Sequence, residues 1–387
     1  MKIRFLTFLS AFILLFSLHQ GGYAAVAPTP AVGKRPANIK ILLTEHAERT
    51  LLETRGRYFV YNADNNALLT ITSTAKCDYL TALPEGLQWG TYPYTNAFRI
   101  RLIPDGESTL LIDGIEYYGG AYIEARKDVV CIVNELDIEL FLACTLAATL
   151  PHDLETEAME AAVIVARTHA YHVAQSSKIP LWDLTAKEIH YEGSGLIHRY
   201  PAIDRAIDHT QHMVLFHQDG TFPATWTEDC AGKTADYTTI FGTPATLPKG
   251  LNAPLAALSR ELHLWSFEIS KKEFAKLVKL NGISSIDLNK DEKSNKVVKI
   301  RVSYQGKELF LDFFAFQALI GSAQLKSNDF SLKIKGDQLV FTGYGSGHGV
   351  GLCLYSAKQL AKEGKKAPQI LDSFFPETKL TRCVETR

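Results

Sequence analysis

Short runs in which apolar and polar residues alternate dominate the chain from Asn38 to about Val133, and this pattern predicts β-strands. Turn-forming residues separate the runs, such as the NADNN stretch that begins at Asn62 and the Pro-Asp-Gly that begins at Pro104. We therefore expect a β-rich N-terminal region at 38–133. The strand-like runs read IKILL, RYFVYN, ALLTITS, FRIRLI, STLLIDG, YYGGAYIEA and DVVCIVN.

Two patterns after this region predict helices. Residues 138–148 are mostly apolar, as expected for a buried helix. Apolar residues then recur at helical spacing over 159–173, and Asp153 is placed to cap this second helix. The polar positions opposite its apolar stripe, which we expect to face solvent or a cleft, are Glu157, Thr168 and Tyr171.

The second half of the chain mixes both periods. Residues 181–240 resemble loops with short strands, 251–285 look helical and polar, and 297–342 return to strands. A further helix is expected from Leu354 to Lys362, because Gly364 is suited to end it. The chain is therefore expected to hold both sheets and helices.

A glycine loop lies between the last strand run and that helix. Every second residue from Gly343 to Gly351 is glycine, and His348 is the imidazole among them. The spacing does not match the dinucleotide fingerprint, and no lysine follows before Lys358, as a phosphate-binding loop would require. Two interpretations stay open: the glycines permit positive φ and close packing, or the loop contacts a substrate.

The N-terminal pattern is that of an export signal. Lys2 and Arg4 precede the apolar run Phe5–Leu18, which is short for a membrane span and is followed by small residues suited to cleavage. We expect a signal peptide at 1–24, a linker at 25–37 and an exported, periplasmic or cell-envelope protein. An uncleaved membrane anchor is the alternative.

Charge and cysteine usage narrow the function class. The 387 residues carry 41 basic and 42 acidic side chains, so no basic excess indicates a nucleic-acid partner. None of the six cysteines forms a C-x-x-C pair or falls at zinc-finger spacing, so we predict no metal site. Export makes disulfides possible, but the sequence does not choose among the pairings, and Cys353 is equally well explained as a buried free thiol.

Three stretches together resemble the SpoIID/LytB family, the stage II sporulation protein D type of peptidoglycan lytic transglycosylase. They are ELDIELFLACTLAATLPHDLETEAMEAAVIVARTHAY, ATWTEDCAGKTADYTTIFG and GYGSGHGVGLCLYSAKQLAKEG. The segments LKSNDFSLKI and PQILDSFFPETKL also look like family elements. The G-H-G-V-G motif followed by a helix is the specific feature, and the chain resembles a chlamydial-type member.

The resemblance implies an α+β fold in which the β-rich region precedes a mixed α/β catalytic core at 134–250 and 335–387. An accessory α/β subdomain at 251–334 is inserted into that core. The implied activity is cleavage between N-acetylmuramic acid (MurNAc) and N-acetylglucosamine (GlcNAc) with an anhydro-MurNAc product, at the division septum. Peptidoglycan glycan strands are the implied partner, with denuded strands one option, and no cofactor is implied.

The position of the family's catalytic acid is substituted in this chain. That acid is the glutamate of an E-M-P stretch, which here reads TLP, so the position falls on Thr149. A threonine hydroxyl cannot act as a general acid near neutral pH. Another carboxylate would have to take over, with Glu157 the first candidate, although a helix N-terminus favours its ionised form. The weaker candidates are Glu155, Glu160 and Asp229.

A non-catalytic role is the alternative: the protein would bind glycan and enhance a partner wall amidase. Cys230 as a thiol nucleophile is a less favoured interpretation. In the family's zinc-binding members the cysteines lie near the segment that here reads SSKIPLWDLTAKEIHYEG, where no cysteine stands. The substrate-binding residues implied by the family motifs are Arg167, Thr168, Tyr171, Gly232, Thr234, Tyr344, His348 and Gly349. Trp226 and Tyr237 are further aromatics suited either to stack on sugars or to pack in the core.

Overall fold

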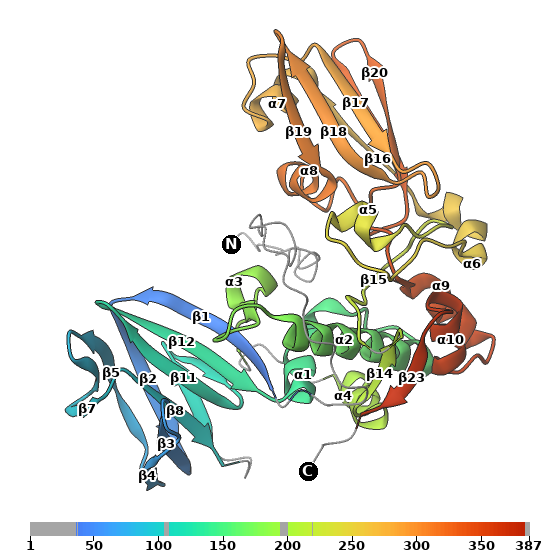
Figure 1. Ribbon diagram of the computed structural model, residues 1–387. Helices are drawn as coiled ribbons and strands as arrows, with labels where there is room; N and C mark the ends of the chain where they lie inside the picture. The colour runs from blue at the N-terminus through green and yellow to red at the C-terminus, as the bar shows by residue number, and fades with distance from the viewer. Residues whose placement is uncertain (1–35, 37, 104–107, 194–199, 219, 384–387) are drawn as a thin grey trace, which may run out of the picture. The chain divides into compact units, whose positions relative to one another are not determined.

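The computed structural model describes residues 36, 38–103, 108–193, 200–218 and 220–383 (Figure 1). The predicted signal peptide and nearly all of the predicted linker lie outside these residues. Helices and several sheets are both present, which confirms the α+β fold expected from the sequence.

The chain packs into two compact units, one formed by 34–148 with 170–207 and the other by 149–169 with 208–383. The boundary passes through a long helix, between His169 and Ala170. The subdivision expected from the sequence was drawn at other points and stays a prediction.

The first unit contains two packed sheets. Their strand orders are β13-β1-β12-β11-β8-β3-β4 and β10-β9-β2-β5-β6-β7. Strands β11 and β12 contact β2, β5 and β6 of the other sheet. The strands are β1 (Ile39–Ala47), β2 (Arg49–Arg55), β3 (Tyr58–Asn62), β4 (Leu68–Thr72), β5 (Lys76–Leu83), β6 (Gly86–Trp89), β7 (Tyr92–Tyr94), β8 (Ala97–Leu102), β9 (Thr109–Ile112), β10 (Ile115–Tyr117), β11 (Gly120–Arg126), β12 (Val129–Leu136) and β13 (Leu184–Thr185).

The alternating pattern explains why these residues form strands. In β2, Leu52 is fully buried while Arg49 and Arg55 at the two ends are exposed, as the period of two in a strand requires. Trp89 and Phe98 are also fully buried and stack with ring centroids 6.4 Å apart. Burying a large apolar side chain contributes about 1.5–3 kcal/mol, so this aromatic pair adds to the stability of the unit.

Helices α1 (Ile138–Thr149) and α2 (Thr156–Ser176) lie where the periodicity predicts them. The predicted cap at Asp153 is wrong, because α2 begins at Thr156 and the Asp153 carboxylate pairs instead with Lys358. Every residue from 161 to 171 is buried, so the polar side of α2 is covered as well as the apolar stripe. Among the described residues, no helix is both long and apolar enough to cross a bilayer.

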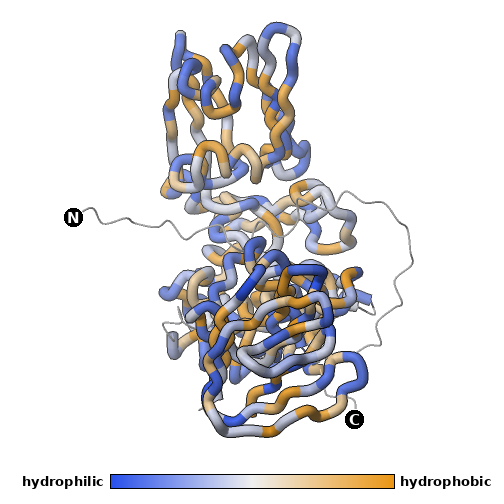
Figure 2. Tube along the Cα trace, turned by 90° about the vertical axis from the view of Figure 1, so that its left-hand side faces the viewer, coloured by the Kyte–Doolittle hydropathy of each residue, from blue (hydrophilic) through white to orange (hydrophobic). Residues whose placement is uncertain are grey.

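The second unit holds most of the remaining elements, with α3 (Ala186–Ile189) belonging to the first unit and α4 (Pro201–His209) lying at the boundary. Two three-stranded sheets, β16-β21-β20 and β17-β18-β19, lie with α7 and α8 around one apolar core. Figure 2 shows hydrophobic and hydrophilic residues alternating along these strands. The core residues include Phe274, Ile300, Phe316, Phe330 and Phe341.

The elements of this part of the chain are β14 (Met213–Phe216), β15 (Trp226–Thr227), α5 (Tyr237–Phe241), α6 (Pro254–Leu258), the 3-10 helix η2 (Arg260–His263), β16 (Leu264–Ser270), α7 (Lys271–Leu277), β17 (Ser285–Lys290), β18 (Val297–Tyr304), β19 (Lys307–Asp312), α8 (Phe313–Ile320), β20 (Phe330–Lys335), β21 (Gln338–Tyr344), β22 (Leu352–Cys353), α9 (Leu354–Lys362), α10 (Ala367–Phe374) and β23 (Lys379–Arg382). Helix α9 has the predicted bounds, and Gly364 follows it with a φ of +85°.

The helix expected over 251–285 is only partly present. Short helices α6 and α7 lie in this stretch, but strand β16 separates them and pairs along its whole length with β21. Its sequence LWSFEIS buries Trp265 between exposed Leu264 and Ser266, which is the period of a strand. Pairing with β21 therefore outweighs the helical tendency of the flanking lysine-rich residues.

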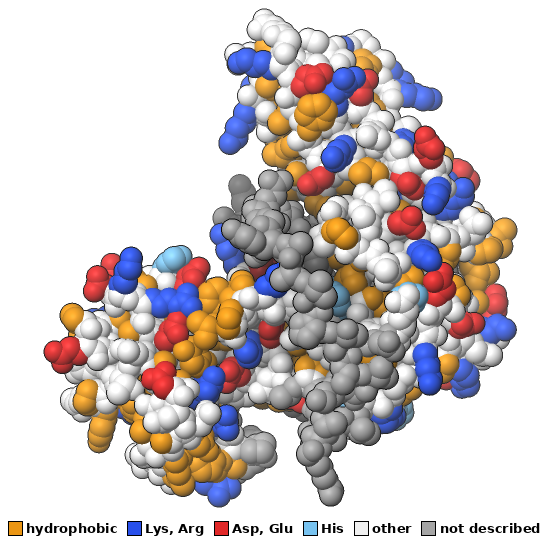
Figure 3. All heavy atoms as spheres, in the orientation of Figure 1, with side chains coloured by type: hydrophobic (Ala, Val, Ile, Leu, Met, Phe, Trp, Pro, Cys, Tyr) orange, Lys and Arg blue, Asp and Glu red, His pale blue; other side chains and the backbone are white. Residues whose placement is uncertain are grey.

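Charges are mixed over the face seen in Figure 3, where acidic and basic side chains are interspersed. This distribution agrees with the near balance of 41 basic and 42 acidic residues. In the part of the chain that the structure describes, this face therefore carries no large area of positive charge that would attract a polyanion.

Candidate functional site

The glycine loop (residues 343–351) is joined to a second segment, residues 225–235, which we call the Glu228 segment. Strands β15 and β22 pair in parallel at one end of this contact. Asp229 and Ser346 exchange two backbone hydrogen bonds of 3.0 Å, and the Ala235 amide donates to the Gly349 carbonyl at 2.8 Å. Two segments far apart in sequence thus form one small structural unit.

Close backbone approach explains the glycines of the loop. Gly351 has a φ of +77°, and a Cβ there would lie 2.1 Å from the Thr225 carbonyl oxygen. At Gly345, with a φ of +71°, a Cβ would lie 2.4 Å from the carbonyl oxygen of Asp229. Contacts this short cannot be made by any residue with a side chain, so packing against the Glu228 segment accounts for these two positions.

His348 lies inside the protein, with 2 % of its surface exposed. Its Nδ1 accepts a hydrogen bond from the Val350 amide at 3.2 Å, its Nε2 lies 3.4 Å from Thr225 Oγ1, and the ring meets Phe241 edge-on. Burial lowers the pKa of His348 to about 4. The imidazole is therefore neutral near pH 7 and holds the turn together.

Three other expected binding residues also support the loops. The Gly349 amide donates to Thr227 Oγ1 at 3.1 Å, and the Gly232 carbonyl accepts from the Ala253 amide at 2.8 Å. Buried Thr234 binds Leu251 through its own amide and through its hydroxyl, which accepts from the Leu251 amide at 3.0 Å. The two glycines contribute backbone contacts, and Thr234 contributes both its backbone and its hydroxyl.

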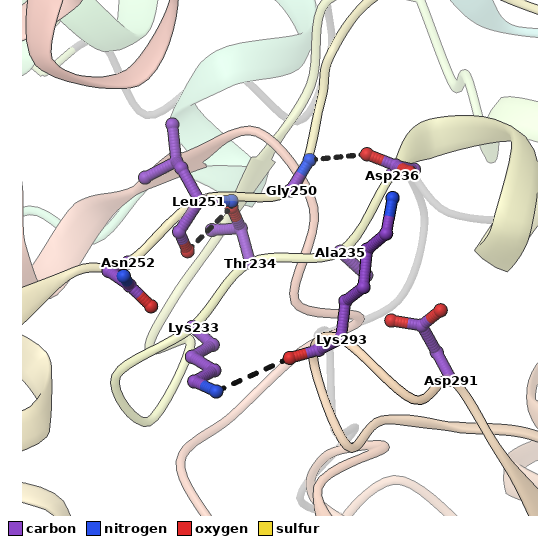
Figure 4. Close-up of a pocket in the computed structure, with 9 residues that line it drawn as sticks. All are labelled: Lys233, Thr234, Ala235, Asp236, Gly250, Leu251, Asn252, Asp291 and Lys293. Carbon is purple, nitrogen blue, oxygen red and sulfur yellow. Dashed lines mark hydrogen bonds between the residues drawn. The ribbon is translucent and has the colours of Figure 1, made fainter.

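Thr234 also lines a small open pocket of about 160 Å³ (Figure 4). Lys233 Nζ donates to the Lys293 carbonyl at 3.3 Å, and the Gly250 amide donates to Asp236 Oδ1 at 2.6 Å. The pocket therefore mixes positive, negative and amide groups. Its lining residues are Lys233, Thr234, Ala235, Asp236, Gly250, Leu251, Asn252, Asp291 and Lys293.

The three residues expected on α2 are fully buried. One guanidinium nitrogen of Arg167 donates to Thr210 Oγ1 at 3.1 Å and to the Met213 carbonyl at 3.2 Å. Thr168 Oγ1 accepts from the Leu215 amide at 2.9 Å. Arg167 and Thr168 thus tie α2 to the residues that lead into and form β14, and Tyr171 lies on the same helix with none of its surface exposed.

Glu157 lies in the first turn of α2 and is held by α10 and the residue before it. Lys366 Nζ lies 2.7 Å from Glu157 Oε1, and the Ala367 amide donates to Glu157 Oε2 at 2.8 Å. Burial alone would raise the pKa of Glu157, but these hydrogen bonds outweigh it and the pKa is lowered. Glu157 is therefore ionised at neutral pH, and Thr149, the last residue of α1, offers only a hydroxyl.

Glu228 has the opposite electrostatic setting, and the sequence analysis did not single it out. It follows β15, is half-buried, and accepts a short hydrogen bond from Ser346 Oγ of the glycine loop. Burial raises its pKa; the hydrogen bond from Ser346 works against that rise, and the charge of neighbouring Asp229 adds to it. This is a carboxyl group whose protonated form persists to higher pH than usual.

Asp229 and His263 form the next pair along the site. Asp229 Oδ2 lies 2.5 Å from His263 Nδ1, while Asp229 Oδ1 accepts from the Ala231 amide at 2.8 Å. The His263 ring meets the Tyr355 ring edge-on, with centroids 4.9 Å apart. The side chain of Asp229 is only 8 % exposed, and its proximity contributes to the raised pKa of neighbouring Glu228.

A buried charge cluster supports the Glu228 segment from the other side. Lys296 Nζ donates to the Cys230 carbonyl at 2.7 Å and to Asp329 Oδ2 at 3.0 Å. Arg260 grips the Asp329 carboxylate with two hydrogen bonds of 2.7 and 2.8 Å, and its guanidinium covers the Tyr344 ring at 4.0 Å. Burial would raise the pKa of Asp329, but Arg260 and Lys296 outweigh it and lower the pKa.

The structure brings several expected residues together in the joined loops, and it gives others contacts with different elements. Gly232, Thr234, His348 and Gly349 belong to the joined loops, with Tyr344 at the edge of the glycine loop, while Arg167 and Glu157 make their own contacts with β14 residues and with Lys366. Trp226 and Tyr237 are buried, 8 % and 1 % exposed. The residue that the sequence analysis missed is Glu228 of the TED stretch; it named the neighbouring Asp229 only as a weaker candidate.

Comparison with known proteins gives one family match and several relatives. A family model described as stage II sporulation protein, SpoIID, matches residues 126–217. An uncharacterized protein of Chlamydia pneumoniae is 31 % identical over 215 residues, or 54 % of this chain and 78 % of that protein. An uncharacterized protein of Brachyspira hyodysenteriae is 24 % identical over 345 residues, 87 % of this chain and 91 % of that protein. Stage II sporulation protein D of Bacillus subtilis is 24 % identical over 267 residues, 65 % of this chain and 76 % of that protein.

Proposed function

This chain belongs to the SpoIID family, and from that premise we propose that it remodels peptidoglycan glycan strands as a lytic transglycosylase of the cell envelope. The family link supports a role connected with the cell wall. Cleavage of the MurNAc–GlcNAc bond, export to the periplasm and action at the septum are the finer parts of the proposal.

The reaction needs one carboxyl group in two protonation states. As a carboxylic acid it gives its proton to the glycosidic oxygen that leaves with GlcNAc. The 6-hydroxyl of MurNAc then attacks the anomeric carbon and returns its proton to the carboxylate, so the 1,6-anhydro ring forms without water. The carboxyl group must therefore be protonated near neutral pH before the bond breaks, which requires a raised pKa.

The proposal depends on the position and the raised pKa of Glu228. This residue is half-buried, its pKa is raised, and the Ser346 hydroxyl holds its carboxyl group against the glycine loop. Glu157 is the first candidate from the sequence. Hydrogen bonds from Lys366 and the Ala367 amide stabilise its anion, so Glu157 is poorly suited to give a proton. We therefore assign the general acid, absent at Thr149, to Glu228.

The neighbours of Glu228 support the same role. Asp229 stays in place through His263 and the Ala231 amide, so its negative charge opposes ionisation of Glu228. The Tyr355 amide donates to the Glu228 carbonyl at 2.9 Å, which fixes the backbone of the acid relative to α9. A fixed backbone limits the positions that the carboxyl group samples, which favours a single proton-transfer geometry.

A second candidate function is a glycan-binding protein that enhances a partner amidase. The observation that favours it is the substitution at the family acid position, where Thr149 stands, together with the ion pair that keeps Glu157 charged. Peptidoglycan strands, denuded strands among them, would still be the ligand. This candidate predicts binding to the wall polymer without anhydro-MurNAc products.

Digestion of purified peptidoglycan by the full chain, followed by mass spectrometry, tests both candidates. We expect anhydro-MurNAc ends from the wild type, a loss of about 10²–10⁴-fold in rate for Glu228→Gln, and near wild-type rate for the matched Glu157→Gln. Products that survive in Glu228→Gln but disappear in Glu157→Gln would move the acid to α2. No product from the wild type, with binding to sedimented peptidoglycan retained, would favour the amidase-enhancer role.

A further inference from the structure

Cys230 and Cys353 meet at the centre of the joined loops. Cys353 ends β22 and caps α9, and its strand partner in β15 is Thr227. Both cysteines are fully buried, and their sulfur atoms lie within 4.8 Å of one another and of an Asp229 carboxylate oxygen. The Cys230 amide donates to Cys353 Sγ at 3.3 Å across a sequence separation of 123 residues. Backbone pairing therefore holds two thiols close together that the chain itself keeps far apart.

We propose that Cys230 and Cys353 form a disulfide that cross-links the Glu228 segment to the start of helix α9. This inference rests on the export to the cell envelope proposed above, because an oxidising compartment lets disulfides persist. It concerns the two thiols alone, and its test does not need the glycan cleavage to be correct.

Several groups contact the Cys353 sulfur atom and stabilise its thiolate form. Burial alone would raise the pKa of its thiol, but hydrogen bonds from the Cys230 thiol and from the Cys230 and Ser356 amides outweigh it and lower the pKa. The N-terminus of α9 adds a partial positive charge at the same place. In the folded protein these contacts keep the Cys353 sulfur atom turned towards Cys230.

The oxidation balances with a disulfide donor, a protein of the dithiol–disulfide oxidase class. The Cys353 thiolate attacks the donor disulfide and releases one donor thiolate, and the Cys230 thiolate then attacks Cys353 Sγ and releases the other. The two cysteines lose two electrons and two protons, and the donor becomes a dithiol. Because both sulfurs are buried in the folded protein, this exchange takes place before the loops close.

A metal ion is the competing occupant of this cluster, and the local charges oppose it. Lys296 places a buried ammonium 2.7 Å from the Cys230 carbonyl. Both Asp229 oxygens already have neighbours, the Ala231 amide and His263 Nδ1. A divalent cation would have to displace His263 and sit beside the Lys296 charge, whereas a disulfide leaves every one of these contacts in place.

The first test maps the cysteines of the full chain, exported to an oxidising compartment and then denatured in an alkylating reagent. We expect the peptides with Cys230 and Cys353 to appear as one cross-linked species that separates on reduction, while the exposed Cys77 is alkylated without reduction. Alkylation of both Cys230 and Cys353 before reduction, or pairing of either with another cysteine, would overturn the proposal. So would stoichiometric zinc in the purified protein with both thiols recovered after chelation.

The second test measures the midpoint of thermal unfolding, Tm, with and without reductant. A cross-link over this many residues predicts a fall of about 5–10 °C on reduction of the wild type and of the control Cys77→Ser. The double variant Cys230→Ser/Cys353→Ser should show no response to reductant. A wild-type Tm that does not change with reductant would contradict the disulfide. If the double variant does not fold, the peptide map of the wild type decides alone. A mapped disulfide in a protein without glycan cleavage would refute the proposed activity and leave the cross-link standing.

Discussion

Glu228 and Glu157 carry the same carboxyl group, and their neighbours shift its pKa in opposite directions. Glu157 accepts hydrogen bonds from an ammonium and an amide, which stabilise the anion. Glu228 is more deeply buried and lies beside Asp229, so its anion is disfavoured despite the hydrogen bond from Ser346. A general acid needs the second setting, and this is why the assignment depends on surroundings rather than on residue type.

The proposed cleavage should depend on pH through Glu228. The acid must be protonated before the bond breaks, so the rate should fall as pH rises through its raised pKa. The Ser346 hydroxyl stabilises the ionised form, so Ser346→Ala should raise the pKa further and move the alkaline limb of the pH–rate profile to higher pH. The profile of kcat/KM against pH measures this shift.

The control for this prediction is Ser331→Ala, since Ser331 is an exposed serine whose hydroxyl donates to the Thr342 carbonyl in its own sheet. Its profile should match the wild type. An Ser346→Ala profile that loses amplitude without moving its alkaline limb would mean that Ser346 orients a group other than a titrating Glu228.

At the scale of elements, the glycine loop is shaped by the segment it packs against. Positive φ explains part of its composition, but the short distances from Gly345 and Gly351 to carbonyl oxygens of the Glu228 segment are the stronger constraint. Backbone contacts hold the loop against this segment, and from there the Ser346 hydroxyl donates a hydrogen bond to Glu228. Its helix α9 begins immediately after β22, so loop, strand and helix act as one element.

Gly351→Ala tests this constraint against a matched glycine. Gly306 has nearly the same φ, +76° against +77°, but nothing lies within 4 Å of a Cβ placed there. Gly306→Ala should therefore cost about 1–2 kcal/mol of unfolding free energy, from φ alone. Gly351→Ala should cost about 1–3 kcal/mol more, because its Cβ meets the Thr225 carbonyl. Urea unfolding of the two variants measures the difference, and equal losses would show that φ alone requires the glycine.

At the scale of the whole molecule, buried charges join parts of the second unit that the sequence keeps apart. Lys296 lies before β18, Asp329 precedes β20, and Arg260 begins η2, yet all three meet beneath the Glu228 segment. Burying these charges costs free energy because they lose their contacts with water. Lys296 and Arg260 offset that cost by donating hydrogen bonds to Asp329 and to the carbonyl groups of Cys230 and Ala231. It ties the subdomain of β16–β21 to the candidate site.

Lys296→Met should destabilise the protein by about 3–5 kcal/mol, because it leaves the Cys230 carbonyl and one Asp329 oxygen without the buried ammonium. Lys299→Met, three residues further on in β18 and with an exposed side chain, should change the unfolding free energy by no more than about 0.5 kcal/mol. Denaturant unfolding monitored by tryptophan fluorescence compares the two. Similar small losses for both variants would mean that Arg260 alone satisfies Asp329.

The sequence by itself determined the α+β class, the strand-rich first part and the two helices around residues 138–176. These depend on the spacing of apolar residues, which is a local property of the chain. It also indicated the family, which the comparisons support, whereas the placement of the family's acid position at Thr149 stays a prediction. Strand β16 was missed because its pairing partner, β21, lies about seventy residues away.

Only the tertiary structure distinguished the carboxyl groups as candidate acids, because the burial of Glu228 and the approach of Ser346, 118 residues away, depend on folding. The same holds for His348, whose neutral and structural state follows from the rings and hydroxyl packed around it. Local spacing specifies where a chain can bend and which face is apolar. The free energy of a charge depends on everything that surrounds it, and that is fixed only when the chain has folded.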